Sequence, residues 1–367
     1  MKKKILYLMH VDWDWIKQRP HYLAENLSKY YIVLVVCPYY ITRTNLTKNS
    51  RAKIKLKSIP HVPIWKNLKL LSLLDNFLMR TSIRYLLKKF KPDYIWITFP
   101  ELYKYLPSKI NCNIIYDCMD DVGEFSDVEY VNSKRISFEI ELIKGASLIF
   151  VSSENLMRVL NNRENCRNKM VLIRNAYDGK MIEFPSSEKL TINKNIYKIG
   201  YVGTVSKWLD FDSLFYCLQH INNIEFHIIG PINVCVDKWK HKRLIFHGPV
   251  NHDLLYSIVH VFDCMVIPFS LNNLILSVDP VKLYEYINFN EPIISIRYNE
   301  VERFSEFISF YSTKEELVDI IRTMINNGFV KKYSEYERTK LLNENSWDVR
   351  TQTILQSIRN FESNSIH

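Results

Sequence analysis

The segment that decides the fold is Ser277-Val278-Asp279-Pro280-Val281-Lys282-Leu283-Tyr284-Glu285-Tyr286. It has the pattern of a helix start and lies between two apolar runs. Asp279 is a favoured N-cap residue and Pro280 suits the first helical position, so the pattern predicts that a helix begins there. One apolar run precedes this segment at Cys264–Ile267 and another follows it at Ile293–Ile296. Short apolar runs of this kind are typical of buried parallel strands. Strand, helix and strand in succession predict an α/β fold.

The same alternation continues along both halves of the chain. In the first half we predict strands at Lys4–Met9, Ile32–Cys37, Tyr94–Thr98, Asn113–Tyr116, Ser147–Val151 and Met170–Ile173. In the second half we add strands at Lys198–Val202, Ile224–Ile229 and Leu244–His247 to the two named above. A polar stretch, Pro185–Asn195, separates the two series. We therefore expect the α/β class with two doubly wound parallel sheets facing a central cleft, in domains 1–185 and 186–345.

The composition disfavours several classes of enzyme. The 367 residues include only eight glycines, and the chain has neither a GxGxxG fingerprint nor a GxxxxGK phosphate loop, which disfavours a dehydrogenase, a kinase and an NTPase. The seven cysteines are scattered and never spaced as CxxC, as expected for reduced thiols in the cytosol. The N-terminal apolar run is short and soon meets Asp12 and Asp14, so we expect a buried strand and not a secretion signal. No run of about eighteen apolar residues occurs, so no membrane-spanning segment is expected.

Most of the net charge of +10 comes from one region. Between Ile41 and Pro92 the chain has thirteen basic residues and one acidic residue, Asp75, interleaved with leucines and aromatic residues. Basic residues beside an apolar helical face suit an anionic membrane surface. A core helix with a solvated basic side would give the same pattern, and both interpretations stay open. The aromatic spacing resembles no RNA-binding motif, so we expect no nucleic acid partner.

Lys282 occupies an unusual position for a cation. It lies in the first turn of the predicted helix, where the dipole and unpaired N–H groups already carry positive charge. A phosphate would compensate that charge, and Glu285, three residues on, could accept hydrogen bonds from sugar hydroxyls. A solvated Lys–Glu pair on a surface helix is the alternative. Polar residues also follow other predicted strands, where doubly wound sheets bind ligands, at 10–14, 117–121 and 203–208.

Several motifs occur in an order that resembles the GT-B glycosyltransferases. They are Gly200-Tyr201-Val202-Gly203-Thr204, Phe226-His227-Ile228-Ile229-Gly230-Pro231, His247-Gly248-Pro249-Val250, the segment from Phe262 to Phe269, Pro280–Tyr286 and Glu291-Pro292-Ile293-Ile294. Earlier segments agree, at 14–21, 116–121, 151–154 and 175–178. The set is most similar to family 4 and its relatives in bacterial capsule, exopolysaccharide and teichuronic acid synthesis. The resemblance covers almost the whole chain.

The resemblance implies a nucleotide-sugar donor, a UDP- or GDP-sugar, in the second domain. Its expected donor-binding residues are Gly203, Thr204, Ser206 and Lys207 in the loop over the phosphates, Lys282 at the diphosphate, Glu285 at the ribose and Pro268 beside the base and ribose. It also implies that residues 346–367, with a helix from Trp347, cross back to the first domain. The family has an acid eight residues before Glu285, where this chain has Ser277, so sugar contacts that depend on that acid are not predicted.

Sugar transfer places negative charge on the leaving diphosphate. Lys207, Lys282 and the helix dipole would stabilise that charge electrostatically, so we expect neither a metal nor a cofactor. Asp120-Asp121 and the pair Asp12 and Asp14 are the weak alternatives as metal ligands.

The acceptor hydroxyl must also lose a proton. Asp120 and Asp117 are the predicted catalytic residues, and the predicted acceptor-binding residues are His10, Asp14, Arg19 and His21. His10 and His21 are the next candidates for the proton acceptor, and Asp117 or Asp120 could instead be a cap or turn residue after the strand. Arg19 and His21 could bind an acceptor phosphate or simply begin a helix at Pro20.

The predicted function is a hexosyltransferase that moves a sugar from a nucleotide sugar to a glycan acceptor, lipid-linked, in bacterial surface polysaccharide synthesis. We expect it in the cytoplasm, in peripheral contact with the inner face of the membrane through residues 41–92. The alternatives are a nucleotide-sugar epimerase or a phosphorylase of the same architecture, and a non-catalytic subunit of a membrane complex.

Overall fold

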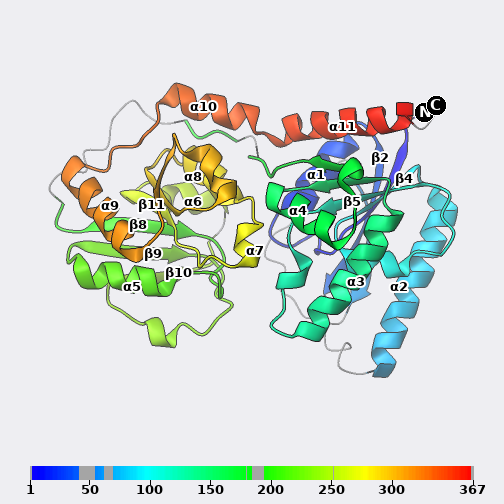
Figure 1. The fold of residues 1–367 in the computed structure, drawn as a ribbon, viewed down its shortest axis with the longest axis horizontal. Helices are drawn as coiled ribbons and strands as arrows, with labels where there is room; N and C mark the ends of the chain where they lie inside the picture. The colour runs from blue at the N-terminus through cyan, green and yellow to red at the C-terminus, as the bar shows by residue number, and fades with distance from the viewer. Residues whose placement is uncertain are drawn as a thin grey trace. The chain divides into compact units, whose positions relative to one another are not determined.

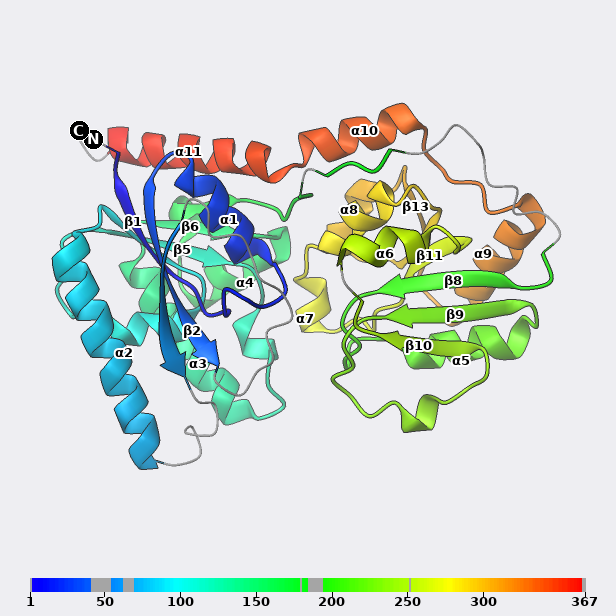
Figure 2. The same ribbon diagram turned by 180° about the vertical axis from the view of Figure 1, so that it is seen from behind.

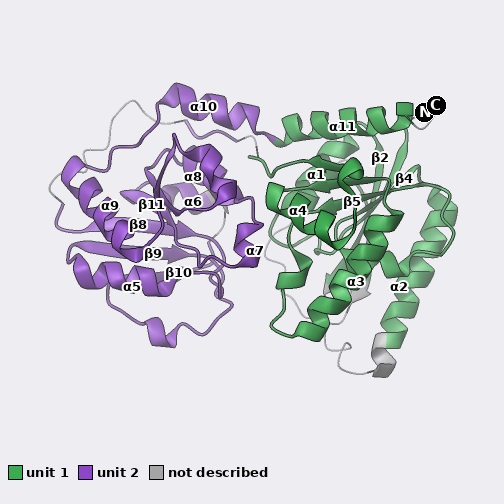
Figure 3. Cartoon of the chain, in the orientation of Figure 1, with its two compact units in different colours: residues 1–178, 347–367 green, residues 179–346 purple. Residues whose placement is uncertain are grey.

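The computed structural model describes residues 2–40, 54–61, 69–178, 180–183, 194–250 and 252–364. The chain divides into two compact units, shown in Figure 3. Unit 1 consists of residues 1–178 and 347–367, and unit 2 consists of residues 179–346. The first boundary therefore lies seven residues before the expected end of the first domain at 185, and the last helix belongs to unit 1.

Unit 1 contains a seven-stranded parallel sheet in the order β3-β2-β1-β4-β5-β6-β7. Figure 1 labels β2, β4 and β5 of this sheet. The strands are β1 Lys4–Leu8, β2 Ile32–Tyr40, β3 Lys55–His61, β4 Tyr94–Ile97, β5 Asn113–Cys118, β6 Leu148–Val151 and β7 Met170–Leu172. The sequence predicted all of them except β3. In β3 the exposed Lys55 and Lys57 alternate with the less exposed Leu56 and Ser58, so this edge strand lacks the apolar run of the buried ones.

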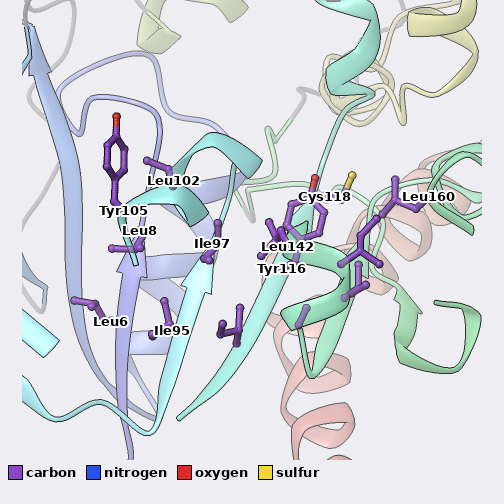
Figure 4. Close-up of a cluster of buried hydrophobic side chains, with 14 of the residues drawn as sticks. Leu6, Leu8, Ile95, Ile97, Leu102, Tyr105, Tyr116, Cys118, Leu142 and Leu160 are labelled. Atoms are coloured by element: carbon purple, nitrogen blue, oxygen red, sulfur yellow. The ribbon is translucent and has the colours of Figure 1, made fainter. Parts of the chain in front are cut away.

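Helices cover both faces of this sheet, as the doubly wound prediction requires. They are α1 Arg19–Ser28, α2 Lys69–Phe90, α3 Glu129–Gly145, α4 Glu154–Arg163 and α11 Trp347–Asn364, with short 3-10 turns η2 Pro100–Tyr105, η3 Val122–Glu124 and η4 Arg167–Lys169. Leu6 and Leu8 pack in one core with side chains of α2, α3 and α4, part of which Figure 4 shows. Ile5 and Tyr7 point to the opposite face and pack in a second core with α1 and α11.

Unit 2 contains a six-stranded parallel sheet in the order β10-β9-β8-β11-β12-β13, with β8, β9 and β10 side by side in Figure 2. The strands are β8 Tyr197–Val202, β9 Ile224–Ile229, β10 Leu244–Gly248, β11 Cys264–Ile267, β12 Ile293–Ile296 and β13 Ile308–Tyr311. Its helices are α5 Phe211–His220, α6 His252–Val259, α7 Asn273–Leu276, α8 Val281–Asn288, α9 Lys314–Asn327 and α10 Glu335–Glu344, with η5 Asp237–Trp239 and η6 Asn299–Phe304. The sequence analysis missed β13.

Each sheet has one point at which its winding reverses. In unit 1 this point lies between β1 and β4, and in unit 2 it lies between β8 and β11. Loops leave the carboxyl ends of the two flanking strands in opposite directions there, so a crevice forms that is the usual ligand site of such sheets. The residues that follow these strands are therefore the ones to examine for function. No helix in the described ranges has the length and apolar character needed to cross a bilayer.

Candidate functional site

A cavity of about 330 Å³ opens at the reversal point of unit 1. Its walls come from the residues that follow β1, β4 and β5 and from the adjacent helix α3. The lining residues are His10, Thr98, Phe99, Tyr116, Met119, Asp120, Val122, Phe125 and Arg135. The cavity thus brings together two residues predicted from the sequence, Asp120 and His10.

Asp120 lies in a firmly anchored loop after β5. The Ser152 hydroxyl donates to the carbonyl of Met119 at 2.9 Å, and the Asp121 carboxylate accepts from the backbone N–H of Gly123 at 3.0 Å. Arg163 also donates to Asp121. Burial raises the pKa of Asp120 to about 7, with a further increase from Asp121 and an opposing effect from Arg19. A carboxylate with a pKa near 7 is well suited to accept a proton at neutral pH.

His10 faces the same cavity in its neutral form. Its Nδ1 lies 2.8 Å from the hydroxyl oxygen of Thr98, and its ring stacks on Phe99 with the ring centres 4.9 Å apart. Burial lowers the pKa of His10 to about 4, and His21 contributes to the decrease. The imidazole is therefore uncharged at physiological pH and can orient a polar substrate group by hydrogen bonding.

Asp117 and Arg19 have a structural role in place of the predicted contacts with substrate. The Arg19 guanidinium binds the Asp117 carboxylate through Nη2 at 2.8 Å and Nε at 3.0 Å, and both side chains are buried. Arg19 also donates to the carbonyl of Ile173 at 2.7 Å. Removing either partner would leave a buried charge uncompensated. The turn interpretation of Asp117 was wrong, because Asp117 lies within β5 and its carboxylate binds Arg19.

His21 and Asp14 do not line the cavity either. His21 Nε2 lies 3.2 Å from the carbonyl oxygen of Trp13, and its Nδ1 accepts from the backbone N–H of Gln18 at 3.2 Å. The Nδ1 contact caps the start of α1, which agrees with the helix-start alternative for this residue, whereas Nε2 contacts the loop after β1. Asp14 lies half-buried in the loop after β1, and its backbone N–H donates to Asp12.

In unit 2, Lys282 lies against the backbone of Gly203, the first residue after β8. A Cβ atom on Gly203 would come within 2.0 Å of Lys282 Cε, and the φ angle of Gly203 is +152°. Gly230 after β9 has a φ of +143°, and a Cβ there would approach the Gly203 carbonyl oxygen to 2.1 Å. Two glycines thus allow the loops after neighbouring strands to approach each other and the lysine closely.

The Lys282 ammonium is desolvated without a close anionic partner among the described residues. Its nearest aromatic contact is the ring of Tyr201, with Nζ 6.0 Å from the centre. Burial lowers the pKa of Lys282, and Glu285 opposes that decrease. Because the first-turn N–H groups of α8 add positive potential, an anion placed here would be bound by both groups.

The predicted N-cap of this helix was wrong by one residue. Helix α8 begins at Val281 with Pro280 in the cap position and no side-chain cap. Asp279 is instead buried and bonded to Arg303, which also donates to the hydroxyl of Tyr284. The Asp279 carboxylate therefore holds the segment that precedes α8 in place through its bond to Arg303.

The other predicted donor residues surround the same reversal point. Glu285 is half-buried on α8, Thr204 and Ser206 are half-buried in the loop after β8, and Lys207 is exposed there. Pro268 is buried, and its carbonyl accepts from the backbone N–H of Asp210 at 2.8 Å. That bond joins the loops after β8 and β11. Ser277, which replaces the family's acid, is buried, and its hydroxyl donates to the carbonyl of Asn273.

Sequence reasoning missed Arg135, Phe99 and Thr98 as cavity residues. Thr98 and Phe99 directly follow β4, so the strand-end rule could have found them. Arg135 lies inside α3 among other charged residues and carries no local signal. Among the described residues, no group of three His, Cys, Asp or Glu side chains is placed to hold a metal ion.

Comparison with known proteins identifies the fold. No family model matches the chain, and no curated protein matches it in sequence. Sucrose-phosphate synthase from Thermosynechococcus elongatus superimposes with a TM-score of 0.75 at 12% identity, over 99% of this chain and 100% of that chain. The lipopolysaccharide outer core galactosyltransferase WaaB gives 0.66 at 14% identity, over 97% and 99%.

Anabaena HepE in complex with UDP and glucose is similar to the same degree, with a TM-score of 0.66 at 14% identity over 97% of this chain and 99% of that chain. These proteins are GT-B glycosyltransferases. The chain therefore has the GT-B fold, with two parallel-sheet domains, as the motif order predicted.

Proposed function

We propose that the chain is a glycosyltransferase that moves a sugar from a nucleoside diphosphate sugar to an acceptor hydroxyl. One observation carries the proposal: the desolvated Lys282 ammonium lies against the glycine backbone of the β8 loop at the start of α8. A diphosphate fits this site because it supplies the missing negative charge. The fold supports the proposal, since HepE with this fold has been solved with UDP-glucose.

The proposed reaction divides between the two units. The bond between the sugar's anomeric carbon and the diphosphate oxygen breaks, and its electron pair stays on the diphosphate. Lys282 and the α8 N–H groups stabilise the added charge, with Lys207 as a further cation in the exposed loop. Asp120 takes the proton of the acceptor hydroxyl while that oxygen bonds to the anomeric carbon. Glu285 binds the ribose hydroxyls in this scheme.

Nucleotide binding tests the proposal directly. We expect UDP or GDP to raise the melting temperature of the protein, with a weaker effect of CMP. Lys282→Gln should weaken nucleoside diphosphate binding about 10–100-fold, since a charge-assisted contact contributes about 1.5–3 kcal/mol. Lys242→Gln removes an exposed charge of the same unit and should bind as the native protein does. Equal affinity of both variants, measured by calorimetry, would remove Lys282 from the donor site.

The proposal also covers the class of sugar, the metal requirement and the class of acceptor. The transferred sugar is a hexose, the reaction needs no metal or cofactor, and the acceptor is a lipid-linked glycan of a bacterial surface polysaccharide. The catalytic charges come from side chains and helix α8, which supports metal independence. Undiminished turnover of a UDP- or GDP-hexose after dialysis against EDTA is the expected result. Loss of turnover that Mg²⁺ or Mn²⁺ restores would contradict it.

Helix α2 supports peripheral contact with an anionic membrane at the inner face of the cell membrane. Met79 and Ile83 are buried in the core of unit 1, whereas Leu73 and Phe77 on another side of the helix are 66% and 64% exposed. The exposed Arg80, Arg84, Lys88 and Lys89 lie on the same helix. Exposed apolar and basic side chains together suit an anionic lipid surface. Of the other predicted basic residues, Lys55 and Lys57 are exposed on β3, whereas Lys53 and Lys66 lie outside the described residues.

Vesicle sedimentation tests the membrane contact. We expect binding to vesicles of phosphatidylglycerol and phosphatidylcholine, and loss of most of that binding in the double variant Leu73→Ser and Phe77→Ser. The matched control is Val330→Ser, which removes a 71% exposed apolar side chain from unit 2. Equal sedimentation of the double variant and the native protein would remove the membrane proposal and leave α2 as a core helix with a solvated side.

A further inference from the structure

We propose that the acceptor carries an anionic group, a phosphate or a carboxylate, and that Arg135 binds it in the cavity that contains Asp120. The inference rests on the proposed transferase function and adds the chemical class of the acceptor. It replaces the expectation that Arg19 binds an acceptor phosphate, because the guanidinium of Arg19 is bound to Asp117 and to the carbonyl of Ile173.

Arg135 is fixed at the cavity wall from two sides. Its Nε donates to the carboxylate of Glu101 at 3.3 Å, and its guanidinium lies 5.8 Å from the centre of the Phe99 ring. Both Arg135 and Phe99 line the cavity. Both contacts exist without a substrate, so the guanidinium is partly oriented before a ligand binds, which reduces the entropy lost on binding.

The Nη1 group of Arg135 is the unusual feature of this wall. It is buried, and none of the described groups accepts a hydrogen bond from it. Buried donors are nearly always bonded in folded proteins, and an unbonded donor on a cation is especially unfavourable. The planar guanidinium matches a carboxylate or a phosphate, which can accept two parallel hydrogen bonds from it.

Glu101 accepts a hydrogen bond from Arg135 Nε, but not from Nη1. Its contact with Arg135 is long at 3.3 Å, and its carboxylate side chain remains 29% exposed. A partly exposed pair of this length is weak. A second anion, on the side of the cavity, would complete the coordination of Arg135 and place the acceptor beside Asp120. Aromatic rings of Phe99 and Phe125 in the same wall would contact the apolar faces of a sugar.

Ligand binding without catalysis tests this inference. The probes are glucose 6-phosphate, glucuronate and glucose at matched ionic strength, and the readouts are thermal shift and calorimetry on the whole chain. We expect both anions to bind saturably and more tightly than glucose. Arg135→Gln should lose at least tenfold in affinity for both anions, and Arg135→Lys should retain part of it. Lys134→Gln, which removes an exposed charge from the position of α3 just before Arg135, should bind both anions as the native protein does.

Three results would overturn the inference: equal binding of glucose and the anions, unchanged anion binding in Arg135→Gln, and no anion binding to the native protein. Each would leave Arg135 as a structural residue that packs between Glu101 and Phe99. UDP binding in the same samples separates this failure from failure of the proposed function. A native response to UDP without anion binding overturns only the acceptor class, whereas no response to UDP contradicts the donor site itself.

Discussion

The reversal points of the two sheets have the same architecture and opposite chemistry. In unit 1 a carboxylic acid, Asp120, borders a cavity, and burial raises its pKa to about 7. In unit 2 an amine, Lys282, lies against a glycine loop, and burial lowers its pKa. Desolvation disfavours the charged form of each group. The comparison shows that the residues after the strands of one fold can shift the pKa of an acid upward and that of an amine downward by the same cause, burial.

Asp120→Asn gives the largest expected effect and tests the unit 1 side of the comparison. The amide cannot accept the acceptor's proton, so we expect kcat to fall by about 10²–10⁴-fold. UDP affinity should be unchanged, because the proposed nucleotide site lies in unit 2. Steady-state kinetics and calorimetry on the same sample measure both quantities. Asp127→Asn, at an exposed position soon after the cavity loop, should have native kcat. A native kcat for Asp120→Asn would instead show that another group accepts the proton.

Gly203→Ala tests the unit 2 side. Its Cβ would collide with Lys282 at a backbone angle that disfavours side chains, so we expect nucleoside diphosphate affinity to fall by about 10–100-fold. Gly248→Ala is the matched control, because Gly248 also has a positive φ of +71° but a Cβ there would meet no atom within 4 Å. Gly248→Ala should lose about 1 kcal/mol of stability from its backbone angle alone, Gly203→Ala should lose more because of the collision, and only Gly203→Ala should lose nucleotide affinity. Calorimetric titration would contradict the crowding argument if both lost affinity equally.

Glu285→Ala tests whether the neighbour of Lys282 binds substrate. Loss of hydrogen bonds to the ribose should weaken UDP binding by about tenfold, and Glu285→Gln should lose less because an amide oxygen still accepts. The comparison of UDP with 2′-deoxy-UDP sharpens this test, since the native protein should discriminate between them and Glu285→Ala should not. Unchanged kinetics in Glu285→Ala would show that the assignment of the ribose site is wrong.

The last expected effect concerns stability, not nucleotide binding or turnover. Burial raises the pKa of Asp120 from its usual 3.8 to about 7, so its contribution to stability is fully present below about pH 4 and is lost as the pH rises through 7. Asp120→Asn removes this loss. The variant should therefore gain up to about 4 kcal/mol relative to the native protein between pH 4 and pH 8, since each unit of pKa shift corresponds to about 1.4 kcal/mol. Urea unfolding across this range measures the difference, and parallel curves for the two proteins would show that the pKa of Asp120 is not raised.

The strand pattern of the sequence predicted most of the fold because buried parallel strands are short, continuous apolar runs. It failed at β3, where the exposed Lys55 and Lys57 interrupt the run at a sheet edge. The order of motifs located the loop around Gly203 and the helix with Lys282, which the structure places in contact.

Side-chain partners were harder to predict. A sequence does not show that Asp117 is bonded to a residue 98 positions away, nor that the two nitrogens of His21 contact its helix start and the loop after β1. The role proposed for Arg135 could not be predicted from the sequence for a related reason. It depends on which groups the fold places beside the guanidinium, and other charged residues of α3 have the same local sequence pattern.

The position of α11 constrains how the chain is made. Ile354 and Ile358 of this helix belong to one core of unit 1, and Trp347 stacks on Tyr22 of α1 with the rings 5.4 Å apart. During translation, residues 179–346 leave the ribosome before these side chains do. Unit 2 can therefore finish folding first. Until α11 has been synthesised, the apolar face of unit 1 that it covers stays exposed to solvent. Chaperone binding to nascent chains should accordingly be concentrated on the earlier-synthesised half and should cease when α11 emerges.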